Sequence, residues 1–430
     1  MHYSYTEVCR VQRDVFDTLN MRLEPERQRL AALLAPPHEA STEWYDQPES
    51  LIRLPYDQAY GALIDGAVAA LLSHDPAATI VCGIGGSHLG AAAVSQFLGP
   101  TNRPLIFADT VDTDLLTTIV ARIEAYAHAG RTVILLIISK SGATIETRAN
   151  GTLLYRVMQE CYHSRAPELT RVIADYGAPM SAEAAAVGID TIPVPRAIGG
   201  RYSVFTAVGM VPLLLAGHDR TALWHGAAAG YEAAVHEQPD NPAIVGASIR
   251  YAHAAQGATI HDTFIFGSDG RGLGEWYRQL LGESLGKKEN LSGQVVETGI
   301  TPTVSIGSND LHSVTQLYLA GPRDKTTTFI FCEPRAAALP IPAGIFSRGL
   351  GAQPTTTSVY DALCDGTRAA FSRAERPYDL WRLSYSAHDA AYFMAIKMVE
   401  VLYEAYLMEI NPFDQPQVEL YKEEIRRRLI

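Results

Sequence analysis

The first candidate for chemistry lies at residues 83–90, where glycines follow a short, mostly apolar run at residues 79–82. The stretch reads Gly-Ile-Gly-Gly-Ser-His-Leu-Gly and then becomes compatible with a helix. Glycines at a strand-to-helix turn leave backbone N–H groups accessible, and a helix N-terminus favours negative charge. The turn therefore predicts an anion site, with a plain tight turn as the alternative. Its spacing matches neither a dinucleotide fingerprint nor a nucleotide-hydrolase phosphate loop.

A second turn, at residues 139–147, is rich in hydroxyl groups. It follows residues 132–138, a run typical of a strand buried on both faces. Its short donors and one cation suit a dianionic phosphate, and they are Ser139, Lys140, Ser141 and Thr144. Ordinary helix capping by Ser and Thr is the alternative. Two such turns after two strands favour a phosphate site, because ligands of open α/β sheets bind at that edge.

Four other side chains could take part in chemistry, but none is distinctive alone. Arg201 follows two glycines, and such a cation either pairs with a carboxylate or faces a ligand; both interpretations stay open. Glu283 lies in a glycine-rich stretch, His312 precedes an apolar helical stretch, and Lys422 lies in a charged segment. Taken singly, each of these three is typical of a solvated or structural residue.

The length and composition of the chain are typical of a large, ordered α/β protein. The chain has 430 residues, of which 47% are hydrophobic, and a formal net charge of −12, which argues against a nucleic-acid partner. Its five scattered cysteines suggest reduced thiols, and no spacing of Cys or His suggests a metal site. There is no secretory pattern at the start and no apolar run long enough for a membrane span. We therefore expect a cytoplasmic protein with no membrane partner.

Element patterns predict two α/β halves. Residues 1–76 look mainly helical, and apolar runs of strand length then alternate with helical stretches, which implies a parallel, doubly wound sheet. The expected strands are 79–82, 104–107, 132–138, 171–174 and 191–194. After Gly217 the pattern begins again, so a domain boundary is expected near residues 218–225.

The second half is expected to contain another sheet and several helices. A strand at 263–266 leads through a glycine-rich turn into a helix that glycines at 282 and 286 should loosen, and a further strand covers 326–332. Residues 386–410 have the spacing of a long amphipathic helix, and a charged helix at 418–429 ends the pattern.

Six separated blocks together resemble one known family. They are Gly83-Ile-Gly-Gly-Ser-x-Leu-Gly90, Ser139-Lys-Ser-Gly-x-Thr-x-Glu-Thr147, Gly199-Gly-Arg-Tyr-Ser203, Glu283-Ser-x-Gly-Lys287, Asn309-Asp-Leu-His-Ser-Val-Thr-Gln-Leu-Tyr318 and Asp414-Gln-x-x-x-Glu-x-x-Lys422. In this order they resemble glucose-6-phosphate isomerase in its shorter bacterial form, over about residues 50–425.

The resemblance implies an α/β fold of two sugar-isomerase (SIS-type) α-β-α sandwiches with parallel sheets. The expected ranges are 1–50 for an N-terminal helical extension, 51–222 and 223–385 for the two domains, and 386–430 for C-terminal helices that complete the active site. It also implies a sugar phosphate as substrate, no cofactor, and a homodimer whose subunits share their active sites.

The family's roles transfer at matching positions. Glu283 matches the base that moves a proton between C1 and C2, and His312 matches the residue that opens the sugar ring. Lys422 matches the ammonium that assists at the ring oxygen, and Arg201 the cation that stabilises the enediolate. The resemblance assigns the phosphate to Gly86, Ser87, Ser139, Lys140, Ser141, Thr144 and Gln415.

Two positions depart from the family pattern. Ala143 replaces a threonine that is common there, and His88 stands where other members carry varied residues, so we expect changed affinity with activity kept. Two alternatives remain: a phosphosugar-binding regulator without chemistry, and a related isomerase with mannose 6-phosphate activity. A regulator would not need Glu283, His312 and Lys422, and the second alternative is less consistent with the full set of motifs.

Overall fold

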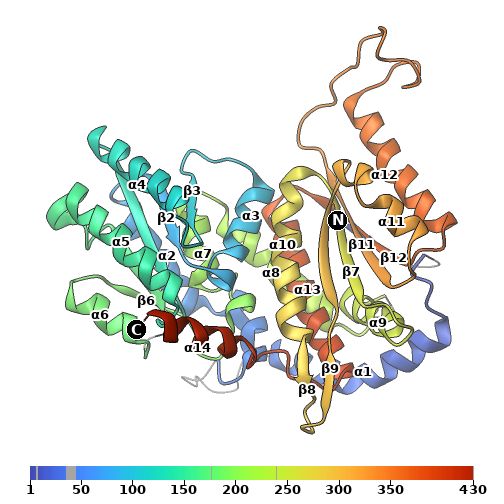
Figure 1. Cartoon of the computed structure of the whole chain (residues 1–430), viewed down its shortest axis with the longest axis horizontal. Helices are drawn as coiled ribbons and strands as arrows, with labels where there is room; N and C mark the ends of the chain where they lie inside the picture. Colours follow the sequence, from blue (N-terminus) through green and yellow to red (C-terminus); the bar gives the residue numbers. More distant parts are fainter. Residues whose placement is uncertain (6–7, 35–44, 176, 239, 430) are drawn as a thin grey trace. The chain divides into compact units, whose positions relative to one another are not determined.

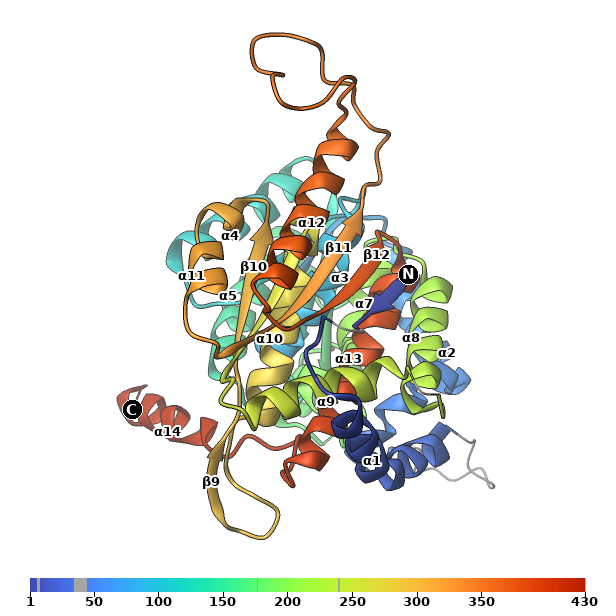
Figure 2. The ribbon, with the colours of Figure 1, turned by 90° about the vertical axis from the view of Figure 1, so that its right-hand side faces the viewer.

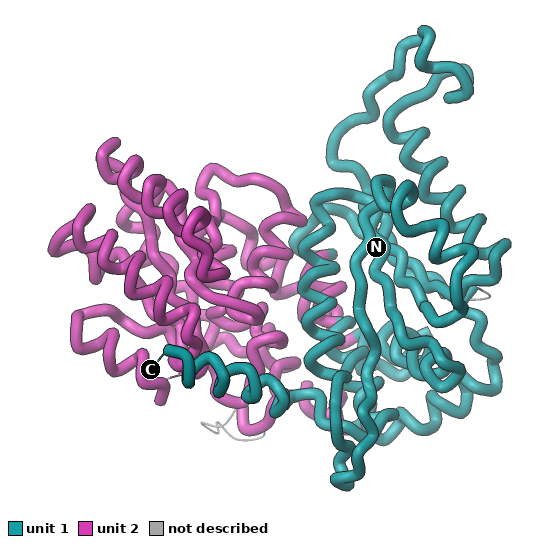
Figure 3. The backbone as a smooth tube through the Cα atoms, in the orientation of Figure 1, with its two compact units in different colours: residues 1–28, 233–389, 396–430 teal, residues 29–232, 390–395 magenta. Residues whose placement is uncertain are grey.

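A computed structural model describes residues 1–5, 8–34, 45–175, 177–238 and 240–429. The contacts divide the chain into two compact units that are interleaved in sequence (Figure 3). Unit 1 comprises residues 1–28, 233–389 and 396–430, and unit 2 comprises residues 29–232 and 390–395. Each unit contains one five-stranded sheet, as the two predicted halves require.

The sheet of unit 2 is wholly parallel and has the strand order β3-β2-β4-β5-β6 (Figure 1). Its strands are β2 Pro76–Cys82, β3 Leu105–Ala108, β4 Thr132–Ile138, β5 Thr170–Ala174 and β6 Thr191–Pro193. Every residue of β2 and β4 is buried, which explains why both read as continuous apolar runs. The five strands predicted for this half are therefore confirmed, β4 with its exact bounds and the other four with shifts of one to three residues at their ends.

Helices flank this sheet, with α4 and α5 packed together on one face and α3 and α7 on the other (Figure 1). The helices are α2 Gln58–Leu72, α3 Leu89–Leu98, α4 Thr113–His128, α5 Ile145–Tyr162, α6 Pro179–Ala186, α7 Ala207–Leu215 and α8 Arg220–Val235. Side chains start some of them: Asp112 accepts a hydrogen bond from Leu115 N at 2.8 Å at the beginning of α4. The arrangement is the doubly wound sandwich that the alternation predicted.

The sheet of unit 1 has the order β1-β12-β11-β7-β10, parallel except for its edge strand β1. Its strands are β1 His2–Ser4, β7 Ile260–Phe266, β10 Thr301–Gly307, β11 Lys325–Glu333 and β12 Tyr378–Ser384. Aromatic residues fill the core on one side of it, namely Phe264, Phe266, Tyr318, Phe329, Phe331, Phe371 and Tyr378. The mainly helical expectation for the N-terminal region was wrong at its start, because β1 pairs with β12 there.

The helices of unit 1 correct two further expectations. They are α9 Pro242–Ala254, α10 Arg271–Leu285, α11 Thr315–Ala320, α12 Thr356–Arg373 and α14 Val418–Leu429, with α13 Ala387–Leu407 except for its residues 390–395, and α1 Arg13–Leu34 begins in this unit. α10 runs unbroken through Gly282 and ends only at Gly286, so it is not loosened at its first glycine. A two-stranded hairpin follows it, formed by β8 Lys287–Glu289 and β9 Val295–Thr298 (Figure 2).

α13 was expected to be amphipathic, but almost all of its side chains are buried. Three of its charged side chains, Lys397, Glu400 and Glu404, are buried and paired inside unit 1. Lys397 Nζ lies 2.8 Å from Glu400 Oε2, and Arg250 of α9 contacts Glu400 and lies 2.6 Å from Glu404 Oε2. Buried charges need such partners, and pairing them within the core removes the need for a polar face.

Candidate active site

The two glycine- and hydroxyl-rich turns lie side by side in unit 2. They follow β2 and β4, which are neighbours, with Val81 opposite Leu136 and Cys82 opposite Ile137. The chain leaves β2 toward β3 on one side and leaves β4 toward β5 on the other, so the strand order reverses between them. Ligands of open α/β sheets bind at such a switch point. The structure therefore brings the two predicted anion turns to one place.

The Arg201 segment packs directly on the first of these turns. A Cβ on Gly86 would lie 2.2 Å from the carbonyl carbon of Gly200 and 2.6 Å from Arg201 N, so only glycine permits this approach. Ser203 Oγ donates to the Gly200 carbonyl oxygen at 2.6 Å and so fixes the backbone of the Arg201 segment. Arg201 itself is 3% exposed, and its guanidinium carbon lies 5.4 Å from the centre of the Tyr202 ring. A buried cation is thus held beside the turn around Ser87.

Helix capping does not account for the second turn. Thr144 occupies the N-cap position of α5, yet its side chain makes no capping hydrogen bond. Instead, Ser139 Oγ, which is buried, donates to Thr144 Oγ1 at 3.2 Å. Ser141 Oγ accepts a hydrogen bond from Ala143 N at 3.2 Å. Because this bond uses the backbone of residue 143, it does not require the threonine side chain that is common at this position in the family. The hydroxyl groups are therefore gathered within the turn before α5 begins.

Burial lowers the pKa of the Lys140 ammonium from its ordinary value, and the Asp175 carboxylate acts in the opposite direction. Desolvation disfavours the charged form of a lysine, whereas a nearby anion favours it. A dianionic ligand beside Lys140 would favour the charged form, as Asp175 does, and would gain from an ammonium that water screens only in part.

His88 also has a defined partner in this unit. Its Nε2 lies 3.2 Å from Asp109 Oδ2, and the buried ring lies 6.1 Å from the ring of Phe107 in β3. The imidazole lowers the pKa of the Asp109 carboxyl group from its usual value, through a hydrogen bond and its charge, against the effect of burial. The departure at position 88 thus forms a pair with Asp109, next to the first turn.

Glu283 lies in the last turn of α10 in unit 1 and is half-buried. The helix is anchored by buried side chains on one face, among them Trp276, Tyr277, Leu280 and Leu281. Gln279 Nε2 donates to Glu283 Oε1 at 3.0 Å and so orients the carboxylate. Gln279 was not predicted, although its position four residues before a candidate base on a predicted helix was a usable signal.

The C-terminal residues of the candidate site are also in unit 1. Lys287 Nζ donates to the carbonyl oxygen of Glu283 at 2.8 Å and to that of Asp414 at 2.6 Å. Gln415, the next residue, is exposed. The contact of Lys287 with Asp414 places it near the end of α10. Lys422 lies on α14, where its Nζ is 2.7 Å from Glu419 Oε1, so its ammonium pairs within its own helix.

His312 ends a short turn, Asn309–His312, that follows β10, and its side chain is exposed. The turn is fixed by Asp310, whose carboxylate accepts from Ile306 N at 2.6 Å and from Ser313 Oγ at 2.7 Å. The contacts thus determine the backbone around His312 while its imidazole stays accessible.

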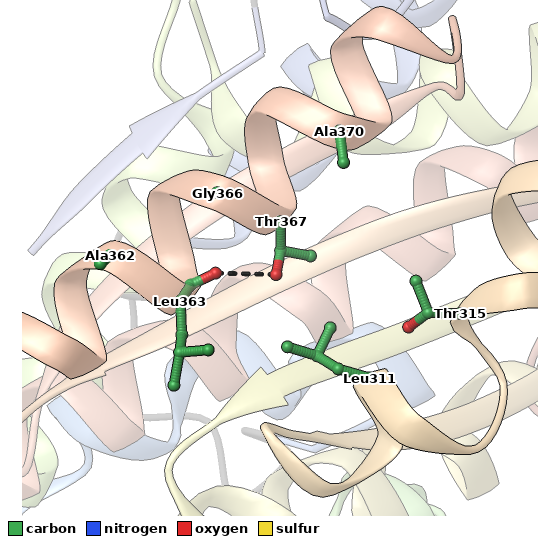
Figure 4. Close-up of a pocket in the computed structure, with 7 residues that line it drawn as sticks. All are labelled: Leu311, Thr315, Ala362, Leu363, Gly366, Thr367 and Ala370. Carbon is green, nitrogen blue, oxygen red and sulfur yellow. Dashed lines mark hydrogen bonds between the residues drawn. The ribbon is translucent and has the colours of Figure 1, made fainter. Parts of the chain in front are cut away.

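A cavity of about 260 Å³ lies next to this turn, between it and α12 (Figure 4). It is lined by Leu311, Thr315, Ala362, Leu363, Gly366, Thr367 and Ala370. The hydroxyl groups of its two threonines both donate to backbone carbonyl oxygens. Thr367 Oγ1 donates to that of Leu363 at 2.7 Å, and Thr315 Oγ1 donates to that of Asp310 at 3.2 Å. An apolar cavity whose hydroxyl groups are so engaged does not suit a phosphate, so it is not the substrate site.

Within the described ranges, no group of three or more His, Cys, Asp or Glu side chains could hold a metal ion. In the same part of the chain, none of the helices combines the length and apolar character that a membrane crossing requires.

The sequence matches the family model for phosphoglucose isomerase over residues 72–338. A glucose-6-phosphate isomerase of Symbiobacterium thermophilum is 33% identical over 408 residues, which cover 90% of this chain and 86% of the relative.

Two solved structures share the fold. A hypothetical protein of Thermus thermophilus superposes with a TM-score of 0.85 at 24% identity, over 97% of this chain and 96% of the other. A glucose-6-phosphate isomerase of Chlamydia trachomatis gives a TM-score of 0.80 at 19% identity, over 99% and 88%. Because the family model matches more than half of the chain and the Symbiobacterium relative is 33% identical over most of its length, the chain belongs to the phosphoglucose isomerase family.

Proposed function

We propose that the protein interconverts glucose 6-phosphate and fructose 6-phosphate, through ring opening and proton transfer by way of a cis-enediol(ate). Membership of the family carries this proposal, and the side chains at the family's motif positions support it. A coupled assay that starts from fructose 6-phosphate and follows glucose 6-phosphate tests it. A sugar-phosphate regulator would bind the substrate without forming product.

Each group at the site has a chemical task. Gly86, Ser87 and the hydroxyl-rich turn with Lys140 hold the phosphate, together with Gln415. His312 and Lys422 move the proton that opens the ring, a step suited to an imidazole near neutral pH. In the open chain the Glu283 carboxylate takes the proton from C2 and returns it to C1, while Arg201 stabilises the negative charge that develops on oxygen.

Replacing Ser139 or Thr144 by Ala should weaken the binding of fructose 6-phosphate by about 1.5 to 3 kcal/mol, because each change removes a charge-assisted hydrogen bond from a desolvated phosphate. Calorimetry in a Glu283→Gln background measures this directly. Thr117→Ala is the matched control, since that hydroxyl donates to the Thr113 carbonyl oxygen of its own helix at 2.7 Å. Unphosphorylated fructose should lose nothing, and an equal loss for both sugars would make the turn structural.

Chelation should leave turnover unchanged, because the proposed proton transfers use only side chains of the chain itself. The measurement compares initial rates after dialysis against EDTA with rates after addition of Mg²⁺ or Zn²⁺. Activity that disappears on dialysis and returns with a divalent ion would contradict the metal-free mechanism.

We propose further that the protein is a cytoplasmic homodimer in which His312 completes the site of the other subunit. The exposed imidazole, on a turn that hydrogen bonds of Asp310 hold, is suited to reach a second copy, and two-fold symmetry would then create two equivalent sites. The five free cysteines fit a reducing compartment.

A further inference from the structure

Lys287 is a buried cation at the point where α10 ends. Its side chain is 6% exposed, although it begins the hairpin strand β8, whose next two residues are exposed. Burying an ammonium is unfavourable unless its N–H groups find acceptors, so the contacts of Lys287 indicate what it stabilises.

The ammonium joins two stretches that are far apart in sequence. It donates to the carbonyl oxygen of Glu283 at 2.8 Å and to the carbonyl oxygen of Asp414 at 2.6 Å, and it lies 3.3 Å from Asp414 Oδ1. The first contact falls in the last helical turn, where carbonyl groups lack helical donors and where a cation also complements the helix dipole. Lys287 thus caps the turn that carries Glu283.

Asp414 is itself held in a defined conformation. Asn411 Nδ2 donates to Asp414 Oδ2 at 3.1 Å, and Asn411 Oδ1 accepts from Phe413 N at 3.0 Å. The other carboxylate oxygen is the one that faces Lys287. The segment between α13 and α14 therefore forms a compact turn with one carboxylate at its centre.

A second contact ties the same two regions together. Leu291 N, in the hairpin after α10, donates to the Glu409 carbonyl oxygen at 2.8 Å, just before the segment that contains Asp414. The hairpin and the segment are thus joined at two places, Lys287 and Leu291, and Gln415 and Lys422 follow along the chain.

We propose that Lys287 is a positioning residue that fixes the C-terminal segment with Gln415 and Lys422 relative to the base Glu283. It acts through backbone oxygens and Asp414 and does not touch the substrate. This inference rests on the proposed roles of Glu283, Gln415 and Lys422. The ion pair between Lys287 and Asp414 would then fix the positions of both the phosphate contact, Gln415, and the ring-opening ammonium of Lys422.

Lys287→Met keeps the length of the side chain but removes the charge. It should lower kcat/KM for fructose 6-phosphate by about 10- to 100-fold, since small misplacements of reacting groups cost rates of this order. KM should rise because Gln415 is displaced, and kcat should fall because Lys422 is displaced. Lys287→Arg should recover much of the loss. Lys288→Met, one residue on and exposed, is the matched control and should behave as wild type.

Hydrogen exchange gives a readout that does not depend on turnover. Amides of residues 411–429 should exchange faster in Lys287→Met, while those of β4 and α5 should stay unchanged. If Lys287→Met does not fold, Asp414→Asn decides, because it removes the carboxylate and leaves the contact with the Glu283 carbonyl oxygen in place. Faster exchange at 411–429 together with a higher KM in that variant would support the proposal.

Wild-type kcat/KM in Lys287→Met would overturn the proposal, as would lost activity without faster exchange at 411–429. Unchanged exchange and unchanged KM in Asp414→Asn would do the same. Failure of the underlying roles would look different: Glu283→Gln or Lys422→Ala would then keep full activity, whatever the exchange experiment shows.

Discussion

Glu283→Gln protein should bind fructose 6-phosphate almost as wild type does but turn it over about two to four orders of magnitude more slowly, the range that a positioned general base contributes. The amide keeps the shape of the side chain and still has an oxygen that can accept from Gln279, which donates to Glu283 Oε1 at 3.0 Å. It cannot accept a proton from carbon. The effect should therefore fall on kcat, with little change in dissociation constant.

The measurement is steady-state turnover together with calorimetric binding. Glu275→Gln is the matched control, since Glu275 lies two turns earlier on the same helix and is also half-buried. It should keep near wild-type turnover. A Glu283→Gln variant within a fewfold of wild-type kcat would show that another group moves the proton.

Two inactive variants should restore activity when they are refolded together. If the site takes Glu283 from one subunit and His312 from the other, a mixed dimer of Glu283→Gln and His312→Ala has one site with both lesions and one with neither. Random pairing makes about half of the dimers mixed, so activity should return to about a quarter of wild type. If each site were built within one subunit, every site would carry a lesion and no activity would return.

A second mixture gives the opposite result and serves as the control. Wild-type chain refolded with the double variant Glu283→Gln/His312→Ala should form mixed dimers without a live site, because each site receives one lesion. The expected activity is about a quarter of that of an all-wild-type sample with the same total number of chains, against about half if sites lie within single subunits. Native mass spectrometry verifies that mixed dimers form in both cases.

The sequence predicted the sheet of unit 2 well because its central strands are buried on both faces. β4 is covered on each side, so every one of its residues is apolar or Thr, and no alternation obscures the run. The two turns after β2 and β4 carried their own signal in glycine and hydroxyl groups. The alternation of elements implied a parallel sheet and so placed both turns at the same edge, whereas the pairing of β2 with β4 comes from the structure.

Unit 1 was harder to predict because its strands and helices owe much to distant partners. β12 contains buried Asp379, which accepts from Thr328 Oγ1 at 2.6 Å, so its sequence does not read as an apolar run. β1 is only three residues long and is defined by pairing with β12 from the far end of the chain. The carboxylates of α13 pair with Arg250, which periodicity along one helix cannot reveal.

The candidate site was likewise predictable where local sequence carries the signal and not where contacts between distant segments decide. Residue type and spacing indicated the phosphate turns, and family motifs indicated Glu283, His312, Lys422 and Arg201. Neither indicated that Gly86 is required by its contact with Gly200, because that contact joins segments that are far apart in sequence. Lys287 was recognised only as part of a motif, since its role depends on a carbonyl oxygen of Asp414.

The most direct test of the account is the transfer of a proton to C2 by Glu283. Wild-type protein acting on fructose 6-phosphate in deuterated water should place deuterium at C2 of the product glucose 6-phosphate, because the proton taken from C1 can exchange with solvent while the carboxyl group holds it. Nuclear magnetic resonance of the product measures this. The Glu283→Gln variant should incorporate deuterium at C2 slower by the same factor as its turnover, whereas incorporation at the wild-type rate would contradict the assignment of Glu283 as the base.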